Sequence, residues 1–224
     1  MRKGFTLSEV LITLGIIGIV AALTIPSLVS AYQKHVVEEK LKQAYSILVN
    51  ASRMAQVDPD FSYTPPKQYT AEGLYENDKY GIFKAYFVPY LQGVTEMKRA
   101  KYSWNGKTMA GEGSLASFSK GCFCLNNGMC FMMVNHGTNY FYIYVDLNGP
   151  STPNVVGRDI FYFALHFTDN GLKIDGKVYQ VYNSTTNDEL LRWCGKTASG
   201  WQGGKSCTEL IIRNSWKIPK DYPW

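Results

Sequence analysis

An uncharged stretch near the N-terminus most constrains what this chain can fold into. From Val10 to Ala31 the sequence holds no charged residue, and a helix of that length can cross a lipid bilayer. Arg2 and Lys3 precede the stretch, so the positive-inside rule predicts a cytoplasmic leader and places the rest of the chain across the membrane. Glu9 lies near the start of the stretch, where a carboxylate is costly in lipid unless a partner pairs with it. We therefore expect a single-pass membrane protein with one acidic group in an unusual place.

The residues around Glu9 resemble the N-terminal signal of type IV pilins and type II secretion pseudopilins. That signal is a basic leader ending in Gly, then Phe-Thr-Leu, a variable residue, Glu and a long apolar helix, and here it reads GFTLSEV at residues 4–10. The resemblance covers residues 1 to about 55. It implies that a prepilin peptidase cuts between Gly4 and Phe5 and that Phe5 is then N-methylated. It also implies that Glu9 pairs with the Phe amine of a neighbouring subunit in a filament.

Electrostatics supports this assembly role for Glu9. Cleavage after Gly4 creates a positive amine within a few residues of Glu9. In a low-dielectric bundle of helices each of these charges lacks water, so each is the other's best available partner. A pair formed between subunits would set the axial register of their packing. The alternative is that Glu9 only snorkels to the lipid headgroups.

The same N-terminus also has features of an ordinary secretory signal peptide. Val29-Ser30-Ala31 offers a small-residue cleavage site, which would release a soluble domain beginning at Tyr32. Two observations argue against this interpretation. The apolar core of a signal peptide is usually shorter, and it does not normally carry an acidic residue such as Glu9.

Beyond Ala31 the sequence changes from wholly apolar to amphipathic. Apolar side chains recur at spacings of three and four from Val37 to Ala55, and charged residues fill the opposite face. We therefore expect one helix from Phe5 to Gln56, in which Pro26 produces a kink or locally removes a hydrogen bond. The expected domains are a leader at 1–4, a transmembrane or filament-core helix at 5–31, its amphipathic continuation at 32–56, and a globular α+β domain at 57–224.

The sequence of the globular part predicts an antiparallel meander of strands. Alternating or aromatic-rich segments separated by Asn- and Gly-rich turns are expected to form strands at 118–125, 129–135, 140–146, 160–167 and 172–174. Shorter strands are expected at 102–104, ending in a turn at Asn105-Gly106, and at 178–181. Helices are expected at 75–91, 187–193 and 208–214. The fold class is therefore α+β, with a long N-terminal helix packed on an antiparallel sheet, which the family resemblance also implies.

Five cysteines lie in the exported part of the chain, where disulfides can form. Cys194 and Cys207 flank the segment between the two late helices, and a bond between them would tie down a loop. Cys124 and Cys130 flank a three-residue turn, which makes them directly opposed on one face of a hairpin. Cys122 is an alternative partner for this second bond. A metal site made of these three cysteines lacks the four-ligand spacing of zinc.

The loop that follows the strand at 140–146 is a candidate calcium site. Asp146, Asn148, Asn154 and Asp159 place carboxylate and amide oxygens close together, and calcium prefers such oxygen ligands. Some pseudopilins hold calcium in a late loop, so the resemblance supports the site. The spacing is not that of an EF-hand, because the bidentate Glu is missing. The alternative is an Asx-rich turn between two strands, and no other cofactor is expected.

Charge and motif content bear on the remaining functions. The formal charge is +5, and removing Arg2 and Lys3 leaves 23 − 2 = 21 basic against 18 acidic residues, which is +3 and too small to favour nucleic acid as a partner. The sequence has no Gly-x-Ser-x-Gly, His-Glu-x-x-His or phosphate-binding Gly-Lys motif, so we do not expect an enzyme.

The sequence thus predicts a structural subunit of a type IV pilus or of a type II secretion pseudopilus. The expected partners are prepilin peptidase, other pilin or pseudopilin subunits, the inner-membrane assembly platform and, before assembly, membrane lipid. The expected location is the bacterial inner membrane, with the C-terminal domain outside the cytoplasm, and then a filament in the periplasm or at the cell surface. Two alternatives stay open: a minor tip subunit with a ligand-binding domain, and a secreted soluble domain.

Overall fold

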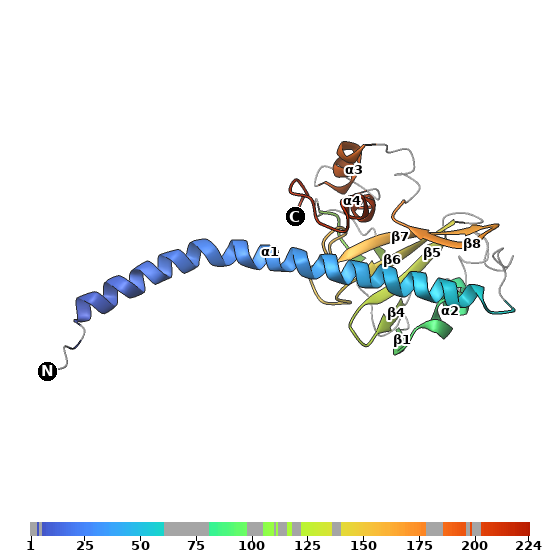
Figure 1. Cartoon of the computed structure of the whole chain (residues 1–224), viewed down its shortest axis with the longest axis horizontal. Helices are drawn as coiled ribbons and strands as arrows, with labels where there is room; N and C mark the ends of the chain where they lie inside the picture. Colours follow the sequence, from blue (N-terminus) through green and yellow to red (C-terminus); the bar gives the residue numbers. More distant parts are fainter. Residues whose placement is uncertain are drawn as a thin grey trace. The chain divides into compact units, whose positions relative to one another are not determined.

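A computed structural model describes residues 4, 6–60, 81–97, 105–109, 111, 116–117, 122–135, 140–177, 186–195, 198 and 203–224. Helix α1 runs without interruption from Leu7 to Gln56 (Figure 1). The chain divides into two compact units, residues 1–37 and residues 38–224, and each is described here by itself. The predicted single long helix is confirmed.

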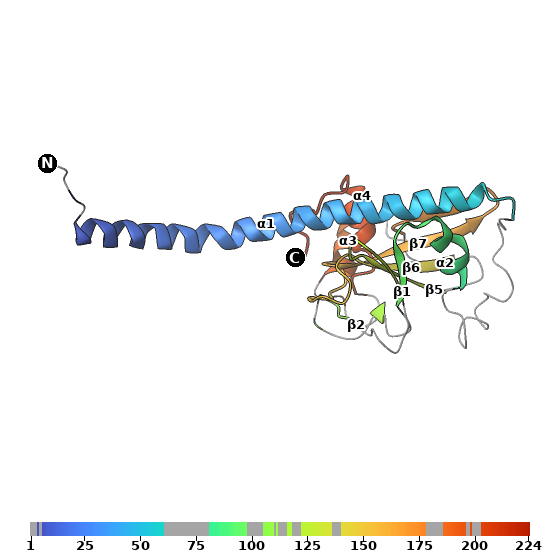
Figure 2. The ribbon, with the colours of Figure 1, turned by 90° about the horizontal axis from the view of Figure 1, so that it is seen from below.

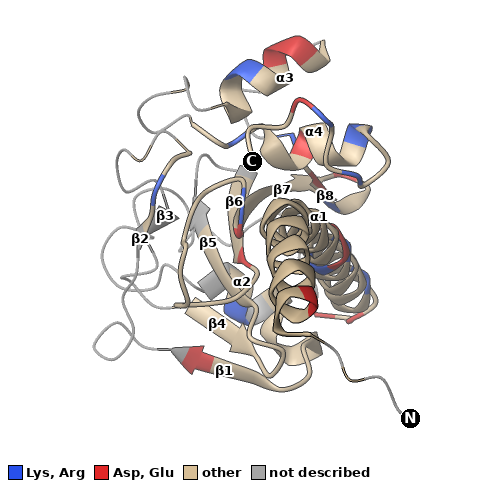
Figure 3. Cartoon of the chain, turned by 90° about the vertical axis from the view of Figure 1, so that its left-hand side faces the viewer, with Lys and Arg blue, Asp and Glu red and all other residues tan. Residues whose placement is uncertain are grey.

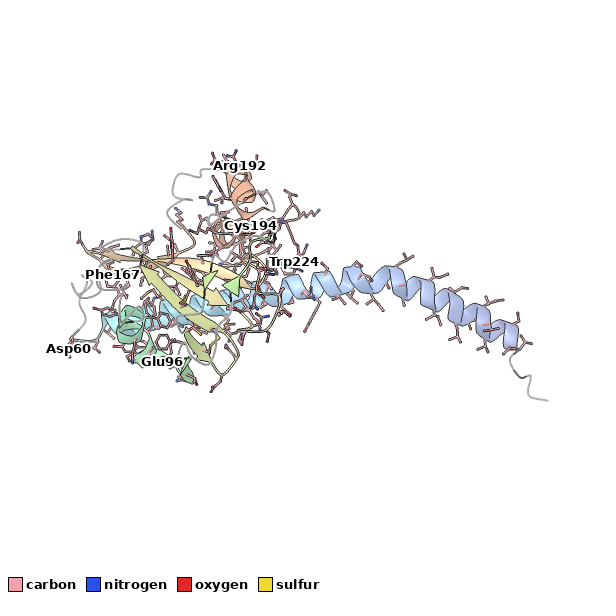
Figure 4. The ribbon with its side chains drawn as sticks, turned by 180° about the vertical axis from the view of Figure 1, so that it is seen from behind. Asp60, Glu96, Phe167, Arg192, Cys194 and Trp224 are labelled. Carbon is pink, nitrogen blue, oxygen red and sulfur yellow. A yellow bond between two sulfur atoms is a disulfide. The ribbon has the colours of Figure 1, made fainter. Side chains whose placement is uncertain are left out.

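The first unit contains the apolar half of α1. From Val10 to Gln33 the helix carries no Lys, Arg, Asp or Glu (Figure 3). Its large apolar side chains are exposed, and they project from the ribbon along its length (Figure 4). By length and composition this helix can cross a membrane. Pro26 lies inside the helix without ending it, and the expected kink stays a prediction.

The second unit is built on a six-stranded antiparallel sheet with the strand order β1-β4-β5-β6-β7-β8. The strands are β1 (Val94–Met97), β4 (Cys122–Leu125), β5 (Cys130–Asn135), β6 (Tyr140–Asp146), β7 (Ile160–Thr168) and β8 (Gly171–Asp175). A separate short pair joins β2 (Asn105–Gly106) to β3 (Ala116–Ser117). The predicted meander is therefore confirmed from β4 to β8, and β1 is an additional strand at its edge.

One face of the sheet is lined by phenylalanine. The register aligns Phe123 with Phe131, and Ile143 with Phe163, on the same face. The ring of Phe83, in helix α2 (Gly81–Tyr86), lies 5.3 Å from that of Phe123 and 6.0 Å from that of Phe131. Tyr45 of α1 lies 5.8 Å from Phe163. This face therefore packs against α2 and the second half of α1, which both lie over the sheet in Figure 2.

The opposite face of the sheet is lined by tyrosine and is also buried. The rings of Tyr144 and Tyr162 lie 4.4 Å apart, and the Lys205 amine lies 5.3 Å from the Tyr142 ring centre. Lys205 comes shortly before helix α4 (Cys207–Arg213), which packs against α3 (Asn187–Cys194). Because both faces are covered, β7 is buried at every position from Ile160 to Leu165.

Some predicted elements differ from the structure. The helix expected over 75–91 is α2 followed by a short 3₁₀ helix, Val88–Tyr90, because Pro89 has no N–H to continue an α-helix. Asn105-Gly106, expected as a turn, is strand β2. The strands expected at 102–104 and 178–181, and residues 75–80, lie outside the described residues.

Candidate functional site

The predicted processing and assembly site begins at Gly4 and ends at Glu9. Phe5, the residue expected to be N-methylated, lies outside the described residues, whereas Gly4 is described and exposed. The Glu9 carboxylate accepts hydrogen bonds from the N–H and from the hydroxyl of Thr6, each at 2.8 Å. The Thr6 hydroxyl in turn accepts the Glu9 N–H at 3.3 Å. This reciprocal pair is a capping box that satisfies two N–H groups at the start of α1.

The capping box explains how an acidic residue can begin an apolar helix. Its carboxylate has partners within its own chain, and it lies near the positive end of the helix dipole, where an anion is stabilised. The sequence contains the signal for this arrangement, because Thr6-x-x-Glu9 directly precedes an apolar run. Sequence reasoning considered only lipid headgroups and a neighbouring subunit as partners for Glu9, and it missed Thr6.

The capping box lies next to the Phe5 amine that cleavage after Gly4 would create. Phe5 directly precedes Thr6, so cleavage after Gly4 would create its positive charge one residue before the cap. A carboxylate has acceptor positions for about four hydrogen bonds, and Thr6 uses two of them. Glu9 therefore keeps the capacity to accept from an amine while it caps its own helix.

Both predicted disulfides are present. Cys194 ends α3 and is bonded to Cys207, which begins α4, with the two Cα atoms 4.9 Å apart (Figure 4). The Ser206 hydroxyl donates to the Leu190 carbonyl oxygen at 2.7 Å and joins the same two helices. Cys124 and Cys130 are directly paired across β4 and β5 and are bonded, with a Cα–Cα distance of 4.0 Å. The globular domain is thus crosslinked at the α3–α4 junction and at the β4–β5 turn.

Cys122 is the remaining cysteine and is a buried free thiol. Its sulfur lies 3.7 Å from that of Cys124. The sulfur atoms of Cys122, Cys124 and Cys130 all lie within 4.8 Å of one another. Burial, followed by the nearby charge of Asp146, raises the pKa of Cys122 to about 12.

The candidate calcium loop is held by backbone hydrogen bonds to the carboxylates of Asp146 and Asp159. Asp146 accepts the Asn148 N–H at 3.1 Å, and Asp159 accepts the N–H groups of Asn154 at 2.7 Å and Val155 at 2.6 Å. Each Asp159 oxygen is therefore already engaged by a backbone amide. The Oδ1 atom of Asn148 is buried and receives no hydrogen bond from the described residues. Burial raises the pKa of Asp159, although these amides oppose the shift. Calcium binding stays a prediction.

These features together define a class of protein. An N-terminal helix with a long apolar half and a capped Glu9, followed by an α+β domain with an antiparallel sheet, is the architecture of a pilin-like subunit. Comparison with protein families agrees, because residues 1–25 match the prokaryotic N-terminal methylation motif.

The rest of the chain matches a second family model. Residues 27–224 match a family of unknown function (DUF6613), and the chain belongs to that family. No curated protein and no solved structure matches the chain.

Proposed function

We propose that the chain is a structural subunit of a type IV pilus or of a type II secretion pseudopilus, and that it works by assembly rather than by catalysis. It is held in the inner membrane by the first half of α1, is cut by prepilin peptidase after Gly4, and is methylated at Phe5. The assembly platform then moves it into a filament of like subunits. The observation that carries this proposal is the exposed apolar half of α1 with a capped carboxylate at its start.

The exposed apolar surface suits a subunit that exchanges one apolar environment for another. Side chains such as Leu11, Ile17 and Leu23 are 61%, 62% and 74% exposed, and this surface is unfavourable in water. In the membrane, lipid covers it, and in a filament core neighbouring helices cover it. Because apolar area stays out of water throughout, transfer from bilayer to filament carries no large solvation cost.

Glu9 is proposed to add specificity to this exchange. In the membrane its carboxylate is satisfied by Thr6. In the filament it also receives the methylated amine of the next subunit, a charge-assisted contact in a water-poor core. That contact sets the axial register of one helix against another. Dispersion between apolar side chains alone does not specify this register.

The test separates the charge of Glu9 from its capping role. Glu9→Gln keeps a hydrogen-bond acceptor for Thr6 but removes the charge, and Glu9→Ala removes both. Ser8→Ala, at the variable position of the motif, is the matched control. We expect both Glu9 variants to be cleaved and membrane-inserted but at least tenfold depleted from sheared or pulled-down filaments, whereas Ser8→Ala assembles normally. Wild-type incorporation of Glu9→Ala would contradict the proposal, and rescue by Glu9→Gln would assign the role to capping instead.

A minor, tip-located subunit with a ligand-binding domain is the second candidate. It is favoured by a surface hollow of about 420 Å³ between the second half of α1, residues 90–92 and the β4–β5 turn. Apolar Ile47 and Leu91 line the hollow together with the amides of Gln92, Asn126 and Asn127. The number of copies per sheared filament decides between the two candidates, because a major subunit is repeated along the filament and a tip subunit is present a few times at most.

A further inference from the structure

Three of the five cysteines lie together beside the β4–β5 turn and share one disulfide. Cys124 and Cys130 form the bond, and the thiol of Cys122 lies 3.7 Å from the Cys124 sulfur. All three residues are buried. We propose that these sulfurs form a thiol–disulfide exchange centre, in which the bond moves from the Cys124–Cys130 pair to the Cys122–Cys124 pair.

The strand register brings the three sulfurs together. Cys124 lies directly opposite Cys130 in the β4–β5 pair. Cys122 comes two residues earlier on β4, and side chains two residues apart on a strand point to the same face. The cluster is therefore held by backbone pairing on both sides of β4, since β1 pairs with the other edge of that strand.

The exchange is chemically balanced. Local opening beside the β4–β5 turn brings the Cys122 thiol to solvent, which takes its proton, and the resulting thiolate attacks the Cys124 sulfur in line with the Cys124–Cys130 bond. A bond forms between Cys122 and Cys124 as the bond between Cys124 and Cys130 breaks, and Cys130 leaves as a thiolate that takes up a proton. One disulfide and one thiol are present before and after, so the step consumes no oxidant and no reductant.

Distance selects Cys124, rather than Cys130, as the sulfur that is attacked. The Cys122 sulfur lies 3.7 Å from the Cys124 sulfur, which carries the bond to Cys130. Cys122 and Cys130 are diagonal neighbours across the strand pair, for which the Cα separation is about 7–8 Å. A Cys122–Cys124 bond requires only the short segment between these two residues to bend until their Cβ atoms are about 3.5–4.5 Å apart, whereas a Cys122–Cys130 bond requires the two strands to shift.

Gly149 lies beside the sulfur of Cys130, the residue that departs in the exchange. Gly149 has a positive φ of 64°, and a side-chain carbon placed there would lie 3.2 Å from the Cys130 sulfur. Glycine at this position thus keeps space beside that sulfur. Cys122 itself is buried and protonated at neutral pH, which keeps the exchange slow and preserves the resting bond.

Three single substitutions in the full chain test the proposal by non-reducing peptide mapping after alkylation with N-ethylmaleimide in denaturant. Cys130→Ala removes the resting bond, and we expect a replacement bond between Cys122 and Cys124. Cys124→Ala removes the shared sulfur, so Cys122 and Cys130 should both be alkylated. Cys207→Ala is the matched control and should leave Cys194 alkylated, because the three-sulfur cluster does not include it.

Alkylation of both Cys122 and Cys124 in Cys130→Ala would overturn the proposal. A Cys122–Cys130 bond in Cys124→Ala would overturn the assignment of the attacked sulfur. The wild-type chain supplies a measurement that does not depend on the folding of a variant. When the folded protein is held at pH 8, acid-quenched at intervals over hours and then alkylated in denaturant, label should appear on Cys130 at the expense of Cys122. Label confined to Cys122 at every time would also refute the exchange.

Discussion

Gly157 lies where the loop after β6, helix α4 and the C-terminal tail meet. Its φ is +89°, and a side-chain carbon there would overlap the Met109 methyl group and would lie 2.6 Å from the Cys207 sulfur. Its carbonyl oxygen accepts a hydrogen bond from the Tyr222 hydroxyl. The position therefore requires glycine for two separate reasons, backbone conformation and lack of space.

A pair of glycine substitutions separates these two reasons. Gly128 has a nearly identical φ of +86° but nothing within 4 Å of the added carbon. Gly128→Ala should lower the free energy of unfolding by about 1–2 kcal/mol, the cost of left-handed backbone. Gly157→Ala should lower it by a further 1–3 kcal/mol or so, because the core is overpacked. Denaturant unfolding of the full chain in detergent measures both, and equal losses would show that space around Gly157 does not matter.

Lys205 is a buried amine on the tyrosine face of the sheet. It is 3% exposed, and burial lowers its pKa from 10.5 to about 8. Between these two values the unfolded chain holds a proton that the folded chain has lost, so this residue makes stability rise with pH over that window. Below about pH 8 the folded protein carries the full cost of a buried charge.

Lys205→Met should therefore change the pH dependence of stability. At pH 7 the variant is expected to have a higher free energy of unfolding than the wild type, because it buries no charge. Between pH 7 and pH 10 the free energy of unfolding of the wild type should rise relative to that of the variant, by up to about 3 kcal/mol. Lys84→Met, on an exposed side chain, is the matched control. If the free energies of unfolding of wild type and Lys205→Met differ by the same amount from pH 7 to pH 10, burial does not govern the ionisation of this amine.

At the scale of elements, the second half of α1 is joined to the C-terminal tail. The buried Glu38 carboxylate accepts hydrogen bonds from the Lys217 ammonium at 2.7 Å and from the Ile218 N–H at 2.8 Å. Lys40 donates to the Leu147 carbonyl oxygen at 2.9 Å, so the same stretch of helix also contacts the loop after β6. Side chains from the helix thus hold two segments that are far away in the sequence.

Removing the Glu38 carboxylate should release the tail. Glu38→Ala is expected to cost about 1.5–3 kcal/mol, the range for hydrogen bonds to a charged group, and to increase amide hydrogen exchange at residues 217–224. The neighbouring Glu39→Ala is the control, since Glu39 is exposed and pairs with Lys42 one turn along the helix, an arrangement worth about 0.5 kcal/mol or less. Unchanged exchange in the tail of Glu38→Ala would contradict this anchoring role.

Elements with strong local signals could be predicted from the sequence. An Asn-Gly turn separates β4 from β5 and an Asp-Asn-Gly turn separates β7 from β8. Helices α3 and α4 were also expected, close to their observed bounds. The Cys124–Cys130 bond followed from a three-residue turn, because such a turn fixes which residues are opposed. Strand β1 was missed, since four residues at the edge of a sheet carry little pattern and their pairing is decided by tertiary contact.

The candidate site was predictable in its residue types and less so in its contacts. The motif at Gly4, Phe5 and Glu9 is contiguous in sequence, so its class could be read directly. The loop from Asp146 to Asp159 was chosen for its oxygen atoms, yet both Asp159 oxygens accept backbone amides. Sequence lists the donors and acceptors of a loop, but the path of the backbone determines which of them pair.

The whole molecule is a membrane-compatible helix that continues into a disulfide-bonded domain. The apolar half of α1 and the methylation motif define the class, and the domain carries the crosslinks at Cys124–Cys130 and Cys194–Cys207. Disulfides form on the oxidising side of the membrane, which is the side that the proposed function assigns to this domain. In the proposed function, filament assembly depends on processing at the N-terminus.

The proposed processing after Gly4 can be tested by mass spectrometry of the mature N-terminus, on protein purified from the native membrane fraction. We expect a chain that begins with N-methylated Phe5, and Gly4→Ala should block its formation and leave the uncut precursor. A mature chain that begins at Tyr32 would contradict the account, because the apolar half of α1 would then be a discarded signal peptide and the domain would act as a free, secreted protein.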